Sequence, residues 1–281
     1  MERELIFNLL KLSLSDREDM NVDAFLGLEG KVWESVFRVM SMHGVAAIVY
    51  NGIEKMPQDV RPCSAPLLSF ISADMAAKRS YAKLSDLVGK INGLLKQRGV
   101  KCMLLKGLSL SQYYPDPQLR KFVDVDLYAP GAEKDVDDAF AAKGIDVNTD
   151  FYRHSHMTVA GVLIENHHCL LDVRGRKLMA ELDADLKAMA LEHLSKLDGP
   201  GLYYPDARFS LIFNLHHAMS HFIYEGISFK FLVDWIFFLR RCKDPLTVNQ
   251  IASDLREHGL MKFAAVMSEV CVSAYRNPYR P

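Results

Sequence analysis

Apolar residues recur at three-to-four spacing through the first hundred positions of the chain, and this spacing is typical of amphipathic helices. One such run covers residues 4–14, a second covers 29–55, and a third covers 67–97. Arg98 and Gly99 follow the third run, and a cation before a glycine is a common end of a helix. The pattern therefore predicts a helical N-terminal region.

The middle of the chain changes to short apolar runs separated by turn residues, which predicts strands. In chain order, we expect strands at 102–105, 122–128, 145–152, 156–160 and 162–173, and helices at 108–114 and 132–143. Gly161 stands between the last two strands and indicates a tight hairpin. This order of elements suits an α+β core with helices on one face of the sheet.

Helical spacing returns in the last third of the chain. We expect one helix at 177–197, two helices within 207–241 that separate at Gly226, one or two more within 246–275, and a tail at 276–281. The chain is thus predicted to have three parts. These are a helical region at 1–98 that packs on the core, an α/β core at 99–174, and a C-terminal helical domain at 175–281.

The composition excludes several classes of function. The 34 Lys and Arg residues balance 35 Asp and Glu residues, so no global basic field attracts nucleic acid and no DNA footprint is expected. The five cysteines are scattered and form no Cys-x-x-Cys motif, which indicates free thiols in a reducing compartment. No apolar run approaches the roughly 20 residues that span a bilayer, and no signal-type core opens the chain. We therefore expect a cytoplasmic protein without membrane contact.

Two acidic residues, Asp124 and Asp126, stand two positions apart in the predicted strand 122–128. Side chains at such positions leave the same face of a strand, with Cα atoms about 6.6 Å apart. Few structural needs place two carboxylates there, because like charges at close range repel. Two carboxylates on one face can converge on a divalent cation.

Upstream, Lys106 and Gly107 join a predicted strand to a short helix, where a glycine lets the backbone approach a phosphate closely.

These motifs resemble the nucleotidyltransferase superfamily, whose best-known member is DNA polymerase beta. The closest branch is that of the uncharacterised bacterial nucleotidyltransferase family proteins. Its pattern is Leu-Lys-Gly, a Tyr-containing helix, an Arg, and then Asp-hydrophobic-Asp-Leu. The matching residues are Leu105-Lys106-Gly107, Tyr113-Tyr114, Arg120 and Asp124-Val125-Asp126-Leu127. The resemblance covers roughly residues 80–240, and it implies a nucleotidyltransferase-type mixed sheet with flanking helices.

A third metal-site acid is expected from a later strand, as in the superfamily. Alternation along 162–173 places Glu165 and His167 on one face, and the branch shows an acid-x-His pattern there. The resemblance therefore implies Glu165 as the third acid, with His167 in a substrate or structural role. Asp172 is the competing acid, but it falls on the opposite face and near the strand end. The alternative for Glu165 is an exposed acid on an edge strand.

The same resemblance implies a nucleotide-binding set made of Lys106, Gly107, Ser109 and Arg120. The glycine turn would approach the phosphates, and the two cations would supply charge to the β- and γ-phosphates. A solvated surface charge is the alternative for each cation. The sequence departs from the superfamily at one point, because Leu108 stands between Gly107 and Ser109 where a serine usually follows the glycine directly.

The branch also has histidines on one C-terminal helix and a Val-Asp-aromatic step on the next, matched here by His217, His221 and Val233-Asp234-Trp235. His217 and His221 are four residues apart and share a helix face. We interpret them as core or groove histidines rather than metal ligands. Asp234 has apolar neighbours and must be paired if it is buried. It either ties the helical domain to the sheet or contacts the substrate.

The function implied is a Mg²⁺-dependent nucleotidyltransferase, with Mn²⁺ as a possible replacement. It would move a nucleoside monophosphate from an NTP to an unidentified hydroxyl-type acceptor, which is a small molecule, a protein or RNA. Asp124 and Asp126 would hold the triphosphate-side ion, while Asp126 and Glu165 would hold the acceptor-side ion. Two alternatives stay open. One is a nucleotide-binding regulatory module with little turnover, and the other is a phosphotransferase or toxin-type enzyme that uses the same site.

Overall fold

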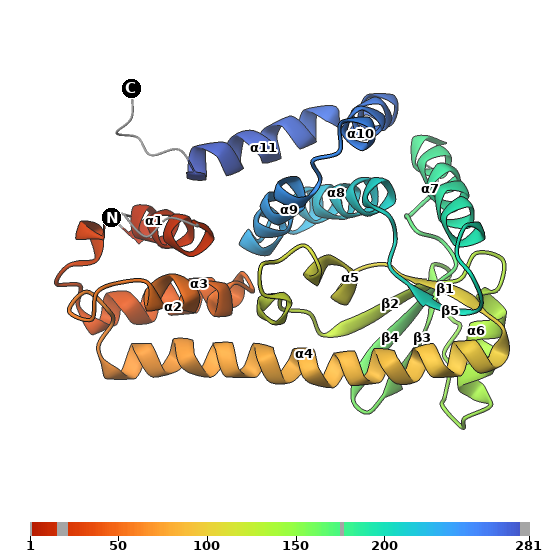
Figure 1. The fold of residues 1–281 in the computed structure, drawn as a ribbon, viewed down its shortest axis with the longest axis horizontal. Coiled ribbons are helices and arrows are strands. Elements are labelled where there is room, and N and C mark those ends of the chain that lie inside the picture. The colour runs from red at the N-terminus through yellow and green to blue at the C-terminus, as the bar shows by residue number, and fades with distance from the viewer. Residues whose placement is uncertain (1, 16–21, 175–176, 276–281) are drawn as a thin grey trace.

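The computed structural model of the protein describes residues 2–15, 22–174 and 177–275. At its centre lies a five-stranded sheet with the order β3-β4-β2-β1-β5 (Figure 1). The strands are β1 (Lys101–Leu104), β2 (Asp124–Tyr128), β3 (His154–Val159), β4 (Val162–His167) and β5 (Gly201–Tyr203). Strand β2 runs parallel to β4 and antiparallel to β1, while β5 runs parallel to β1. This mixed sheet with surrounding helices confirms the predicted α+β class.

Alternation along the two central strands separates an apolar face from an acidic one. Val125 of β2 and Ile164 of β4 point into one apolar core, so Asp126 and Glu165 point to the opposite face. The parallel register pairs Asp126 with Glu165. The sequence of these two strands therefore decides that their acids meet on the same side of the sheet.

Helices cover both faces of the sheet. Helix α4 (Ser64–Arg98) and helix α6 (Glu133–Ala141) pack on the face that carries Val125. On the other face, Met103 of β1 packs in the same cluster as Leu182 and Leu186 of α7 (Lys177–Ser195). The expectation of helices on one face only is therefore wrong, because alternate residues of β1 are buried in two different cores.

The long helix α4 extends beyond the sheet to the N-terminal helices, as Figure 1 shows. These are α1 (Glu2–Leu14), α2 (Gly30–Met42) and α3 (Ala46–Glu54), with a short 3-10 helix at Asp23–Phe25. The single helix predicted for 29–55 is in fact two, because Gly44 adopts φ 72° and ends α2. Phe70 of α4 packs edge-on against Trp33 and Phe37. Helix α4 therefore belongs to both parts, and the predicted division at residue 98 stays a prediction.

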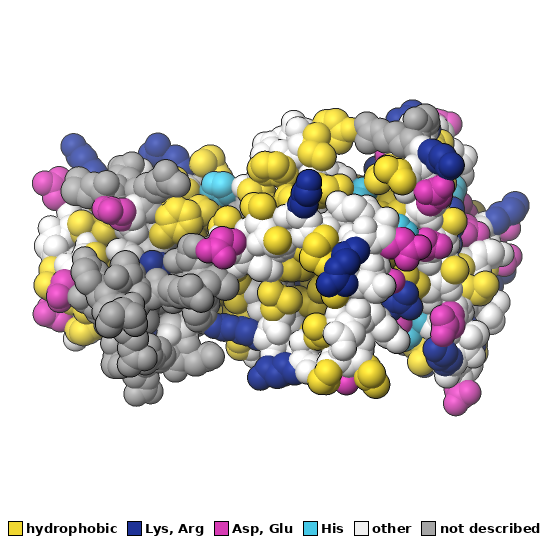
Figure 2. All heavy atoms as spheres, turned by 90° about the horizontal axis from the view of Figure 1, so that it is seen from above, with side chains coloured by type: hydrophobic (Ala, Val, Ile, Leu, Met, Phe, Trp, Pro, Cys, Tyr) yellow, Lys and Arg dark blue, Asp and Glu magenta, His cyan; other side chains and the backbone are white. Residues whose placement is uncertain are grey.

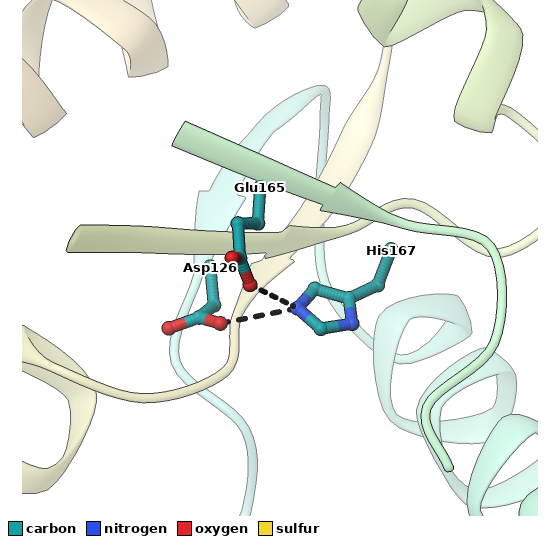
Figure 3. Close-up of side chains that lie close together, drawn as sticks. All are labelled: Asp126, Glu165 and His167. Carbon is teal, nitrogen blue, oxygen red and sulfur yellow. Dashed lines mark hydrogen bonds and ion pairs between the residues drawn. The ribbon is translucent and has the colours of Figure 1, made fainter. Parts of the chain in front are cut away.

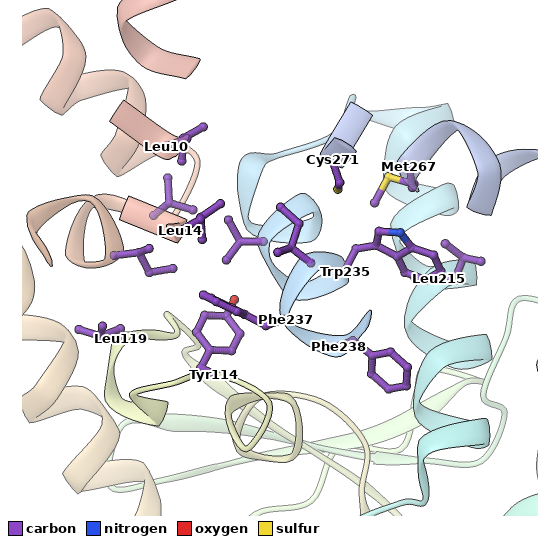
Figure 4. Close-up of a cluster of buried hydrophobic side chains, with 14 of the residues drawn as sticks. Leu10, Leu14, Tyr114, Leu119, Leu215, Trp235, Phe237, Phe238, Met267 and Cys271 are labelled. Atoms are coloured by element: carbon purple, nitrogen blue, oxygen red, sulfur yellow. The ribbon is translucent and has the colours of Figure 1, made fainter. Parts of the chain in front are cut away.

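The C-terminal helices lie on the side of the sheet opposite α4. They are α8 (Ala207–Tyr224), α9 (Phe229–Arg241), α10 (Pro245–Glu257) and α11 (Met261–Tyr275). Helices α8 and α9 separate around Gly226, as predicted. A single apolar cluster joins these helices to α1, and Figure 4 shows Leu10 and Leu14 of α1 on the side of the cluster that faces α9. Tyr114, in the segment after the short helix α5 (Leu108–Ser111), packs on Phe237 from the sheet side.

Two strand predictions are wrong in their extent. Residues 145–152 form only an isolated bridge between Asn148 and His156, because the Asn148 side chain accepts a hydrogen bond from the Asp150 N–H and makes a local turn. The strand predicted for 162–173 ends at His167. After it, the N–H groups of Leu170 and Leu171 donate to the carboxylate of Asp183 in α7, so the chain leaves the sheet.

The surface carries mixed charge. On the face in Figure 2, basic and acidic side chains are scattered rather than gathered into one stripe. Within the described residues, no helix is long and apolar enough to cross a membrane. The tail predicted for 276–281 lies outside the described residues.

Candidate active site

An acidic cluster lies where β2 and β4 run side by side (Figure 3). His167 Nε2 lies 3.0 Å from Asp126 Oδ1 and 3.5 Å from Glu165 Oε2. The ligand atoms of these three residues all lie within 4.8 Å of one another. The structure thus brings together Asp126, Glu165 and His167 as the alternation predicts. Asp172, the competing acid, instead pairs with Arg174.

Lys106 completes the charge balance of this cluster. Its Nζ lies 2.6 Å from Asp126 Oδ1, and the Asp126 side chain is 1% exposed. Burial alone would raise the pKa of Asp126, but Lys106 and His167 outweigh it and hold this pKa well below its usual range. Burial likewise disfavours the charged forms of Lys106 and His167, yet Asp126 outweighs it and both pKa values are raised. The opposite charges in this buried cluster therefore stabilise one another's ionised forms.

Carboxylate oxygens of Asp126 and of the nearby Asp124 could bind a cation. Asp126 Oδ2 is buried and has no hydrogen-bond partner among the described residues. Asp124 makes no ion pair within the described part of the chain, and burial followed by the nearby Asp126 raises its pKa. An unpaired buried carboxylate oxygen is costly unless a cation or donor satisfies it. Carboxylate oxygens of Asp126 and Glu165, with those of Asp124 on the same face of β2, suit a hard divalent ion such as Mg²⁺ or Mn²⁺. The raised pKa of His167 favours its protonated form, which bonds to Asp126 and is not a metal ligand.

The Gly107 turn lies beside these acids. Gly107 has φ 63° and ψ −112° and caps the short helix α5. A Cβ at this position would lie 3.2 Å from Phe122 Cδ2. The backbone angle therefore favours glycine, and a Cβ would also crowd the Phe122 ring. The turn lines the same pocket as Asp124 and Asp126, which is the location expected for a phosphate-binding turn.

Arg120 and Asp234 form a buried ion pair between the loop before β2 and helix α9. Arg120 Nε donates to Asp234 Oδ1 at 2.8 Å and Nη2 donates to Oδ2 at 2.9 Å. Tyr114 also donates to Asp234, and Arg120 Nη1 donates to the carbonyl of Gly107. The guanidinium thus connects the Gly107 turn to helix α9. Of the two roles open for Asp234, this geometry supports the connection to the sheet.

The remaining predicted residues occupy different environments. The Ser109 hydroxyl is buried and donates to the Leu105 carbonyl at 3.0 Å, inside the first turn after the glycine. His217 lines the pocket, and burial lowers its pKa well below the usual range. His221 lies beside it with ring centroids 4.6 Å apart and contacts Glu225 through Nδ1 at 3.1 Å.

The pocket itself extends from the acids to the C-terminal helices. Its walls include Asn214 and His217 of α8 and Lys230 and Phe231 of α9. Sequence reasoning missed Lys230, which follows the break between α8 and α9. The available signal was a lysine in the first turn of a largely apolar helix, but only the fold brings Lys230 to the pocket that Asp124 and Asp126 line.

Comparison with known families identifies a match over most of the chain. A family model described as "Uncharacterised nucleotidyltransferase" matches residues 29–275. The match extends beyond residues 80–240 and includes the N-terminal helices from α2 onward, the sheet and the C-terminal helices. No curated protein and no solved structure matches the chain.

Proposed function

Because the chain belongs to the family of uncharacterised nucleotidyltransferases, we propose that its site moves a nucleoside monophosphate from an NTP to a hydroxyl-type acceptor with the help of Mg²⁺ or Mn²⁺. The acceptor would be a small molecule, a protein or RNA. The reaction forms a bond between the acceptor oxygen and the α-phosphorus while the bond from that phosphorus to the β-phosphate oxygen breaks. Pyrophosphate leaves with the electron pair, and the acceptor proton passes to a carboxylate of the site or to water.

The observation that supports this proposal most is the register of β2 and β4. It pairs Asp126 with Glu165 and leaves Asp126 Oδ2 buried without a partner, while Asp124 on the same strand opens into the pocket. Nothing in the packing of the sheet needs three acids here. The proximity of Asp126 and Glu165, with Asp124 and the glycine turn lining the same pocket, supports a site for nucleotidyl transfer.

Each residue has a distinct part in the proposed reaction. Bound divalent ions would supply charge neutralisation at the α-phosphate and at the acceptor oxygen. Asp124 and Asp126 would hold the ion on the triphosphate side, and Asp126 with Glu165 would hold the ion on the acceptor side. Gly107 offers backbone N–H groups to the phosphates. Lys106 and His167 keep Asp126 ionised and oriented through their contacts with its Oδ1.

The experiment is an assay of the purified protein with ATP, GTP, CTP or UTP, Mg²⁺ or Mn²⁺, and pools of acceptors. Pyrophosphate is measured together with the mass of the product. Addition of a nucleoside monophosphate supports the proposal, whereas addition of phosphate alone indicates a phosphotransferase. Asp124→Asn serves as the inactive control. The proposal is wrong if no NTP binds in calorimetry and Asp124→Asn changes no measured property of the site.

One observation favours the regulatory alternative. Lys106 and His167 already balance Asp126, so the cluster can stand without an ion. Ser109 is also bonded to the backbone of its own turn, although the superfamily places a serine next to the phosphates. A binding module would retain nucleotide affinity and release no pyrophosphate with any acceptor, and the assay above distinguishes this outcome directly.

A further inference from the structure

One cation in the pocket is not explained by packing. Lys230, at the start of α9, lines the pocket together with Asp124 and Asp126. Lys106 and Arg120 each have a carboxylate partner. Among the described residues, none forms an ion pair or hydrogen bond with the Lys230 ammonium, which lies 5.6 Å from the centroid of the Phe231 ring. Lys230 is therefore the free cation of this wall within the described structure.

The position of Lys230 is costly in three respects. Its side chain is partly buried, and desolvation, followed by the nearby Arg120, lowers the pKa of the ammonium. It is the second residue of α9 after Phe229, where the helix dipole disfavours positive charge. Asp234 and Asp124 counteract these effects, but among the described residues neither forms an ion pair with the Lys230 ammonium. A charge kept at such a site indicates an anionic ligand.

The surroundings of Lys230 identify which anion fits. The charged groups that act on it are, in order, Arg120, Asp234, Asp124 and Lys106. Lys230 lines the same pocket as Gly107 and Arg120, and the Arg120 guanidinium donates to the Gly107 carbonyl. An uncharged base or acceptor hydroxyl would not offset the desolvated cation, whereas a phosphate would. The N-terminus of α9 adds partial positive charge for the same ligand.

We infer that Lys230 binds the polyphosphate tail of the NTP, at the β- and γ-phosphates that leave as pyrophosphate. This inference rests on the proposed function. It transfers to Lys230 the role that the sequence suggested for Arg120, whose Nε and Nη2 both donate to the Asp234 carboxylate. As the bond to the α-phosphorus breaks, the negative charge that grows on pyrophosphate lies beside this ammonium.

Calorimetry with ATP, AMP and inorganic tripolyphosphate, each with Mg²⁺, tests the inference. Lys230→Met should weaken ATP and tripolyphosphate binding by about tenfold or more, because a charge-assisted hydrogen bond is lost. The affinity for AMP should change by less than about twofold, because AMP has no β- or γ-phosphate. Lys230→Arg should retain most of the ATP affinity. The exposed Lys243, just after α9, provides the matched control Lys243→Met, which should bind all three ligands as the wild type does.

Thermal unfolding separates a ligand role from a structural one. Since Lys230 pairs with no described anion, Lys230→Met should leave Tm unchanged or raise it. Wild-type ATP affinity in Lys230→Met overturns this inference alone, and so does an equal loss of ATP and AMP affinity. A fall in Tm with Lys230→Met also contradicts it, because the side chain would then be structural. If the wild type binds no NTP at all, the proposed function fails and this inference fails with it.

Discussion

The three acids of the site share one face of the sheet but differ in their electrostatic surroundings. Asp126 lies between Lys106 and His167 and is held ionised. The pKa of Glu165 is lowered first by its hydrogen bond from His167. Asp124 has no ion-pair partner in the described chain, and its pKa is raised. The Asp126 carboxylate therefore stabilises the folded protein, whereas the Asp124 carboxylate destabilises it.

This difference predicts opposite effects on stability for two conservative substitutions. Asp126→Asn leaves two buried cations without their partner, so it should cost about 3–5 kcal/mol of unfolding free energy. Asp124→Asn removes an unpaired, partly desolvated charge and should cost nothing or stabilise slightly. Both should abolish pyrophosphate release. Urea unfolding of the metal-free proteins measures the first effect, and equal stability of the two variants would contradict the assigned charge network.

His167 should make the stability of the metal-free protein depend on pH. Asp126 and Glu165 outweigh burial and raise the pKa of His167. The stabilisation is complete below the unfolded value of about 6.5, and it is lost as the pH rises through the higher pKa of the folded state. Wild type should therefore exceed His167→Gln by up to about 1.5–3 kcal/mol near pH 6, with a smaller difference at alkaline pH. Urea titrations with a chelator test this, and a difference that grows with pH would contradict it.

Residue patterns predicted the acidic face but not the partners of its charges. Alternation with period two placed Asp124 with Asp126, and Glu165 with His167, because strand geometry alone fixes those faces. The Arg120–Asp234 pair joins residues 114 positions apart, and no local pattern reports a contact of that range. Lys230 was missed for the same reason. Its significance depends on a helix packing opposite a strand from another part of the chain.

At the scale of elements, helix α9 and the loop before β2 are joined by the Arg120–Asp234 pair. Their side chains are 4% and 10% exposed, so removal of either partner would leave a buried charge unpaired and lower the free energy of unfolding. The pair also holds Gly107 through its carbonyl. The connection between the sheet and the helical domain is thus made at the wall of the candidate site.

Breaking that pair should be costly, and replacing both members should be much less so. Asp234→Asn is expected to lower the unfolding free energy by about 3–5 kcal/mol, because it leaves the buried Arg120 without its carboxylate. The double variant Arg120→Met/Asp234→Leu should recover much of this loss. A double-mutant cycle by urea unfolding measures the coupling. Additive losses in the cycle would show that the two residues act independently.

Element predictions succeeded where local signals were strong and failed where tertiary contacts decided. Gly99 and Gly226 marked real helix ends, and the hairpin at Gly161 forms with Ala160 and Gly161 both at positive φ. The strand after His167 failed because Asp183, on a later helix, captures the N–H groups that would have continued the sheet. That competition is invisible in the sequence of the strand itself.

At the scale of the whole molecule, a single apolar cluster runs from the N-terminal helices to the C-terminal ones. Trp33 of α2 and Trp235 of α9 both belong to it. Helix α4 adds a second link, since Phe70 packs in this cluster and Leu84 packs on the sheet. The protein therefore has the contacts of one cooperative unit, despite the three parts expected from its sequence.

The two tryptophans can report this cooperativity separately. Trp33→Phe leaves only Trp235 as a fluorescent reporter, and Trp235→Phe leaves only Trp33. In each variant, the urea midpoint from the fluorescence of the remaining tryptophan should equal the midpoint from far-UV circular dichroism. The reason is that both tryptophans lie in one continuous core. A tryptophan transition that precedes the loss of helix in either variant would show that the N- and C-terminal helices unfold independently.

The most direct test of the central claim is a crystal structure with Mn²⁺ and a non-hydrolysable NTP, with the metal located by anomalous scattering. We predict Mn²⁺ bound by the carboxylates of Asp124, Asp126 and Glu165, with the triphosphate running past Gly107 toward Lys230. A nucleotide bound away from this pocket, or Mn²⁺ absent from these carboxylates at saturating concentration, would contradict the account.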